Sequence, residues 1–150
     1  VEQERKNAAL IHLIHSENWQ QVLVFASAKN TCNRLVLKLA KAGLQAAAFH
    51  GDLSQSARNK ALEDFKAKKI RVLIATDVAA RGIDIQQLPY VVNFELPRSA
   101  NDYIHRIGRT GRAGQQGYAV ALITEEDEEH FRLIEKRMKK RLPREQILGL

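Results

Sequence analysis

The sequence predicts a three-layer α/β domain in which a mostly parallel sheet of five, or at most six, strands is flanked by helices. Short apolar runs alternate with helical periodicities along the whole chain, and most of these runs are too continuously apolar for strands with one solvent-facing side. A length of 150 residues allows one domain with a sizeable core. Residues 1–150 are therefore expected to form a single domain.

The expected strands are short runs rich in Val, Leu, Ile and Ala. They cover residues 22–25, 46–49, 72–75, 91–94 and 118–123. Because such runs are apolar on both faces, they are expected to form the buried middle layer.

Helical periodicities fill the intervals between these runs. An amphipathic helix around residues 10–14 precedes the first strand, and apolar side chains step through residues 32–40 with helical spacing, followed by Gly43 as a C-cap. A further helix is expected to start near Ser54. Its inward-facing side chains are Ala57, Ala61 and Phe65.

Two more helices are expected in the second half of the chain. The first begins at the capping box Ser99-x-x-Asp102. Its apolar stripe is formed by Ala100, Tyr103, Ile104 and Ile107. The last helix covers about residues 125–141, with acids at its start and bases towards its end. Compensation of the helix dipole explains these charges better than a dedicated RNA-binding strip.

Composition restricts the class of protein. The formal net charge of +7 favours an anionic partner such as nucleic acid. The single cysteine, Cys32, excludes an internal disulfide and a cysteine-based metal cluster, in keeping with a reducing cytosol. No apolar run could span a bilayer, and no signal-peptide pattern follows Val1. We expect a cytoplasmic domain without membrane contact and, because the chain does not start with Met, one excised from a longer protein.

Polar residues follow the predicted strands at the positions where parallel α/β sheets bind their ligands, beyond the carboxyl ends. Four separate segments contribute: Ser27 to Lys29, His50 to Asp52, Thr76 to Asp77, and the Arg-rich residues 105–112. Their clustering predicts the functional edge of the sheet.

Two segments at or beside this edge suit phosphate groups. Gln55 and Arg58 lie at a predicted helix start, where free backbone N–H groups favour anions, although an ordinary capped helix with an exposed Arg gives the same pattern. Residues 76–84 offer the Thr76 hydroxyl, the Arg81 charge, and Asp84, whose carboxylate could accept from two vicinal hydroxyls. The alternative for this segment is a turn held by an Asp side chain and an Arg–Asp pair.

The segment His-Arg-Ile-Gly-Arg-Thr-Gly-Arg, residues 105–112, is suited to grip a polyphosphate. Arg109 and Arg112 offer planar forks of donors that match phosphate oxygens, and the glycines allow a ligand to approach the backbone. A flexible RNA-binding loop is the alternative. The capped helix that precedes the segment argues against it, because that helix would hold the loop in place.

Residues 75–84 and 105–112 resemble motifs V and VI of the DEAD-box ATP-dependent RNA helicases, and nearly the whole chain is similar to the C-terminal, second RecA-like domain of that family. Residues 25–29 resemble motif IV, with Ser27-Ala28 where the family usually has Asn-Thr, and Gln55-x-x-Arg58 resembles motif IVa. The stretch 142–150 resembles the bacterial RhlE-like group.

The resemblance implies roles for individual residues. Arg109 and Arg112 would act as catalytic arginine fingers on ATP held mainly by the other RecA-like domain, and Asp84, beside Gly82, would bind the ATP ribose. His105 would link across the cleft to that domain. The residues implied in contacts with the RNA backbone are Ser27, Lys29, His50, Gly51, Gln55, Arg58, Thr76, Asp77 and Arg81.

The chain contains neither a Gly-x-x-x-x-Gly-Lys-Ser/Thr loop nor an Asp-Glu-Ala-Asp stretch. The phosphate cradle and the Mg²⁺ site are therefore expected on a preceding N-terminal domain, and the isolated, monomeric chain is expected to hydrolyse no ATP. Expected binding to RNA is independent of base sequence. The rival functions are a non-catalytic RNA-binding module and a DNA helicase domain of the same superfamily. A Rossmann-type enzyme is disfavoured because no Gly-x-Gly-x-x-Gly follows a strand.

Overall fold

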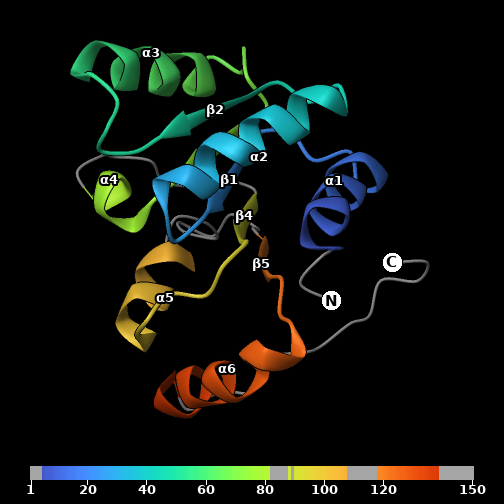
Figure 1. Ribbon diagram of the computed structural model, residues 1–150, viewed down its shortest axis with the longest axis vertical. Coiled ribbons are helices and arrows are strands. Elements are labelled where there is room, and N and C mark those ends of the chain that lie inside the picture. Colours follow the sequence, from blue (N-terminus) through green and yellow to red (C-terminus); the bar gives the residue numbers. More distant parts are fainter. Residues whose placement is uncertain (1–4, 82–87, 89, 108–117, 139–150) are drawn as a thin grey trace.

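The computed structural model describes residues 5–81, 88, 90–107 and 118–138, which form a parallel sheet with helices around it (Figure 1). The elements in chain order are α1 (Lys6–Ser16), β1 (Val22–Phe25), α2 (Lys29–Lys41), β2 (Ala46–Phe49), α3 (Gln55–Lys66), β3 (Val72–Ala75), α4 (Asp77–Arg81), β4 (Tyr90–Asn93), α5 (Ala100–Ile107), β5 (Tyr118–Ala121) and α6 (Glu125–Met138). The five strands pair only in parallel, in the order β2-β3-β1-β4-β5. The predicted fold class is confirmed.

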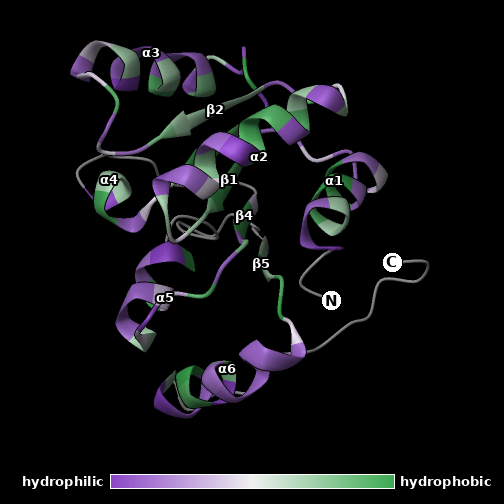
Figure 2. Cartoon of the chain, in the orientation of Figure 1, coloured by the Kyte–Doolittle hydropathy of each residue, from purple (hydrophilic) through white to green (hydrophobic). Residues whose placement is uncertain are grey.

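Successive side chains of each strand point to opposite faces of the sheet, so the hydrophobic core has two layers. Val22 and Val24 of β1 pack in one cluster with α1 and α2, whereas Leu23 and Phe25 pack in a second cluster with α3. All four side chains are buried, which explains why the run is apolar on both faces. Figure 2 shows the hydrophobic stretches along β1 and on parts of the helices around it. Each fully buried Val or Leu side chain stabilises the fold by about 1.5–3 kcal/mol.

Helices α5 and α6 pack on each other and form a third, smaller cluster. The rings of Tyr103 and Phe131 meet edge to face with centroids 5.8 Å apart. His130 Nε2 donates to the carbonyl oxygen of Pro97 at 2.7 Å, which ties α6 to the loop before α5. The expectation that Ile104 belongs to the buried stripe of α5 is wrong, since it is 45 % exposed and Arg106 is buried instead. The stripe follows residues 100, 103 and 106, three apart, rather than the step to 104.

Most predicted helix boundaries are confirmed. Ser54 caps α3, because its hydroxyl accepts a hydrogen bond from the Ala57 N–H at 3.1 Å, and Gly43 follows α2 with a φ of +81° that suits a residue without Cβ. Ala57 was expected to face the core but is exposed, and the buried side chains of α3 are Ala61 and Phe65. Helix α4 was not predicted, since five residues are too few to show a helical period.

Three strand boundaries shift slightly: β4 begins and ends one residue earlier than expected, and β5 ends at Ala121 rather than at residue 123. Helix α6 begins at Glu125 as predicted, whereas the expected end of the last helix falls outside the described residues. Among the helices of the described ranges, none is long and apolar enough to cross a membrane.

Candidate functional site

The carboxyl ends of four strands lie together. The register aligns Ala75, the last residue of β3, with Phe25 of β1 and with Phe49 of β2, and it aligns Phe25 with Asn93 of β4. The polar residues that follow these strands must therefore gather along one edge of the sheet. This confirms the expected clustering of the β1, β2 and β3 loops.

The loops after β1 and β2 are joined by direct contacts. Lys29 Nζ lies 2.7 Å from Asp52 Oδ2, and the hydrogen bond from Lys29 lowers the pKa of the Asp52 carboxyl. His50 is only 3 % exposed: its Nδ1 accepts from the Asp52 N–H at 3.3 Å, so Nε2 carries the proton and donates to Asn33 Oδ1 at 2.9 Å. The buried His50 side chain thus holds the loop through these two hydrogen bonds. Its contact with RNA stays a prediction. Gly51 faces open space.

The start of α3 presents an incompletely bound guanidinium. Arg58 Nη2 donates to Gln55 Oε1 at 3.2 Å, and Gln55 Nε2 donates in turn to Asn59 Oδ1 at 2.9 Å. The Nε of Arg58 is buried and has no hydrogen-bond partner among the described residues. Gln55 therefore orients the Arg58 side chain beside the N-terminus of the helix, where free backbone N–H groups favour an anion.

The segment after β3 continues directly into α4. The Thr76 backbone lies within the edge, where its N–H donates to the Phe49 carbonyl at 3.3 Å. Arg81 pairs with the Asp102 carboxylate on α5. Asp77, expected to contact RNA, places both carboxylate oxygens 2.7 Å from the guanidinium of Arg106.

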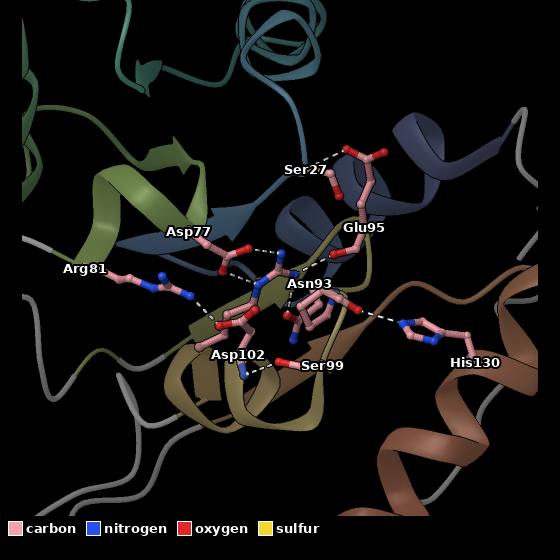
Figure 3. Close-up of polar contacts among 10 residues, drawn as sticks. Ser27, Asp77, Arg81, Asn93, Glu95, Ser99, Asp102 and His130 are labelled. Atoms are coloured by element: carbon pink, nitrogen blue, oxygen red, sulfur yellow. Dashed lines mark hydrogen bonds and ion pairs between the residues drawn. The ribbon is translucent and has the colours of Figure 1, made fainter.

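Sequence reasoning missed Arg106, whose side chain is 1 % exposed. Besides Asp77, it donates to Asn93 Oδ1 at 3.0 Å and to the Glu95 carbonyl oxygen. Its guanidinium carbon also lies 5.0 Å from the centre of the Phe25 ring. Figure 3 shows Asp77 and Asn93 near the backbone of Glu95 at this edge, with the Glu95 carboxylate turned toward Ser27. The signal in the sequence was the spacing of Arg106, three residues after Tyr103 on the buried face of α5.

His105 is exposed and lines a shallow pocket between α4 and α5. The other lining residues are Phe25, Asp77, Ala80, Arg81, Asp102 and Arg106. Gly82, Asp84, Arg109 and Arg112 lie outside the described residues, so the predicted ATP contacts are not located. Within the described ranges, no three His, Cys, Asp or Glu side chains form a group that could hold a metal ion.

Comparison with known proteins identifies close similarity over this domain. Residues 5–114 match the family described as the helicase conserved C-terminal domain. The chain is 45 % identical over 142 residues to the ATP-dependent rRNA helicase RRP3 of Phaeosphaeria nodorum, covering 95 % of this chain and 26 % of that protein. It therefore spans about a quarter of that relative's length.

Two solved structures show the same fold. The E. coli DEAD-box protein SrmB, bound to regulator of ribonuclease activity A, superposes with a TM-score of 0.90 at 35 % identity, over 96 % of this chain and 85 % of the SrmB chain. The S. cerevisiae Dbp5 variant L327V, bound to RNA and ADP BeF3, gives a TM-score of 0.81 at 34 % identity, over 90 % of this chain and 36 % of that one.

Proposed function

The chain belongs to the helicase conserved C-terminal domain family, as the C-terminal domain of a DEAD-box RNA helicase, and from this membership we propose that it binds the RNA backbone along the carboxyl edge of its sheet and completes an ATPase site. ATP, with Mg²⁺, would be held mainly by an N-terminal RecA-like domain of the same protein. Cleft closure by ATP and RNA together would then separate a short RNA duplex.

The observation that carries the RNA part of this proposal is the position of the Arg58 guanidinium, which Gln55 orients. It stands at the N-terminus of α3, where the helix dipole and free N–H groups favour a phosphate. Lys29 adds a second exposed cation at the start of α2, 2.7 Å from the Asp52 carboxylate. The bound RNA reported for the Dbp5 structure supports RNA binding by a domain of this fold.

The nucleotide part of the proposal concerns residues that directly follow α5 in the chain. Arg109 and Arg112 would stabilise the charge that develops on the transferred phosphoryl group, an effect worth roughly 10³- to 10⁵-fold in rate. Asp84 would accept from the ribose hydroxyls, next to Gly82, and His105 would face the other domain. The isolated chain, a monomer in this proposal, would hydrolyse no ATP.

Two finer assignments are also proposals. A cytoplasmic location follows from the single reduced cysteine and the ATP-dependent chemistry. Membership in the RhlE-like group rests on residues 142–150, which lie outside the described residues.

The test of the RNA assignment is a salt titration of RNA affinity in the two-domain protein. Arg58→Ala should weaken binding about equally for unrelated single-stranded sequences and reduce the salt slope by roughly 0.7, the value for one lost phosphate contact. Lys66→Ala is the matched control, because it removes the same charge from the far end of α3.

An unchanged slope for Arg58→Ala, or a loss confined to one base sequence, would contradict a backbone contact. Repeating the titration with DNA, and measuring ATP hydrolysis with each nucleic acid, separates the rival functions. Stimulation by DNA alone would indicate a DNA helicase, and the absence of hydrolysis would indicate a non-catalytic RNA-binding module.

A further inference from the structure

We propose that Arg106 and Asp77 form a positioning pair, which sets the start of the arginine-finger segment against the ends of β3 and β4, and that Asp77 acts on catalysis through Arg106 rather than by contacting RNA. The inference rests on the function proposed above. It deepens that function by assigning roles to two residues of the same edge, one of which sequence reasoning overlooked and the other of which it assigned to RNA.

The geometry of Asp77 favours a positioning role. Both of its carboxylate oxygens accept from the Arg106 guanidinium, with Nε–Oδ1 and Nη2–Oδ2 distances of 2.7 Å. Such a fork-to-fork pair is strong and fixes the relative orientation of its partners. The negative charge of this carboxylate would repel an RNA phosphate.

Arg106 binds three strand ends at once. Its Nη1 donates to Asn93 Oδ1, at the end of β4, and to the Glu95 carbonyl just beyond that end. Asp77, its other partner, lies two residues after the end of β3. The Phe25 ring at the end of β1 lies against the guanidinium. The Asn93 Nδ2 has no partner among the described residues, which indicates that Arg106 sets the orientation of this amide.

Arg106 lies close in the chain to the proposed arginine finger Arg109. It lies in the last turn of α5, two residues before Gly108 and three before Arg109. Holding Arg106 therefore fixes the end of α5, from which the chain continues to Arg109. A displacement of about 1 Å at a reacting group can cost roughly 100-fold in rate.

Glu95 connects this anchor to the loop after β1. Its carboxylate accepts from the Ser27 N–H at 2.9 Å, just before α2, whose N-cap residue Ala28 has no side-chain acceptor of its own. The same negative charge, after burial, contributes to raising the pKa of the Cys32 thiol to about 11. Glu95 therefore contacts the Ser27 loop through its carboxylate and Arg106 through its backbone carbonyl.

The decisive experiment measures RNA-stimulated ATP hydrolysis and RNA affinity of the two-domain protein carrying Asp77→Asn. The substitution removes the charge and one of the two acceptors while conserving size. We expect kcat at saturating RNA to fall roughly 10- to 100-fold, with RNA affinity in the absence of nucleotide changed less than about twofold. A raised Kd for RNA with kcat intact would instead support a direct RNA contact and overturn the proposal.

Asp64→Asn is the matched control, because Asp64 pairs with Lys60 on α3 and has a similar side-chain exposure, 21 % against 26 % for Asp77. It should leave kcat unchanged. Thermal unfolding of each variant verifies that the assays report on folded protein. If Asp77→Asn does not fold, Asp77→Glu, which keeps the charge on a longer arm, should fold and show an intermediate kcat; a wild-type kcat in that variant would overturn the proposal.

Combination with Arg109→Ala distinguishes positioning from a general structural role. If Asp77 acts through the finger segment, the double variant should lose little beyond the Arg109→Ala single variant. Fully multiplicative losses would overturn the proposal while leaving the proposed function intact. A two-domain protein without any RNA-stimulated hydrolysis would overturn both, so the two failures are distinguishable.

Discussion

Two buried cations bind adjacent carbonyl groups just beyond the end of β4, and they do so in different ways. Lys6 of α1 donates to the Phe94 carbonyl at 3.0 Å and lies 3.4 Å from Asp127 of α6. Arg106 of α5 donates to the next carbonyl, that of Glu95, and also engages Asp77 and Asn93. The same short stretch of backbone is thus held by an ammonium group from one helix and a guanidinium group from another.

The difference follows from the chemistry of the two side chains. The Lys6 ammonium is a compact charge, with the Phe94 ring 5.7 Å away, and its contacts tie α1 to α6. The Arg106 guanidinium is a planar fork that can meet several acceptors in fixed directions, and its contacts tie strand ends at the proposed site. We infer that the Lys6 contacts serve stability alone, whereas the Arg106 contacts serve stability and catalysis.

The largest expected effect belongs to Arg106→Met, which leaves the Asp77 carboxylate without its partner. We expect the free energy of unfolding to fall by about 3 kcal/mol, the lower end of the range for breaking a buried ion pair, because Asp77 keeps partial access to water. Urea unfolding of the chain measures this. A loss below about 1 kcal/mol would show that the network contributes less than its geometry suggests.

Lys6→Met should have a smaller effect on stability and none on catalysis. Methionine can retain the packing against Phe94, but the Phe94 carbonyl loses its donor, which costs about 1–2 kcal/mol. The measurement is urea unfolding together with RNA-stimulated ATP hydrolysis of the two-domain protein. A kcat reduced as far as in Asp77→Asn would remove the functional distinction between the two cations.

The smallest expected effect concerns acid stability. Burial raises the pKa of the Asp127 carboxyl, but the hydrogen bond from the Thr124 N–H and the Lys6 charge lower it by more than burial raises it. The net pKa therefore lies below the usual 3.8. Because the pKa is lowered in the folded state, the resulting stability is present above 3.8 and is lost as the pH falls through the folded-state pKa.

Removing the Lys6 charge should therefore flatten the acid limb of the stability curve. Urea midpoints of the parent chain and Lys6→Met, followed from about pH 6 to about pH 2, should converge as the pH falls. Asp52 serves as the comparison, since its pKa is also lowered but by Lys29, and its share of the acid limb should persist in Lys6→Met. Parallel curves over the whole range would show that Lys6 does not stabilise the Asp127 carboxylate.

The fold and the location of the site were largely predictable from local patterns. Runs such as residues 22–25 are apolar at every position, which only a strand covered on both faces requires, and all four side chains are indeed buried. The parallel arrangement then places residues after each strand at one edge, so the gathering of Ser27, His50 and Thr76 followed from strand placement alone. Helix α4 was not predicted, because five residues are too few to show a helical periodicity.

The partners of the polar side chains were decided only by the tertiary structure. By itself, the sequence determined only that Asp77 follows a predicted strand and that Arg106 lies in a predicted helix. The distance of 2.7 Å between them depends on how α4 and α5 pack against the sheet, and the burial of Arg106 in place of Ile104 depends on which face α5 turns inward. The periodicity of apolar residues in a sequence predicts which face of a helix is buried. It does not predict where a charged side chain is buried, because such a side chain needs acceptors that come from distant parts of the chain.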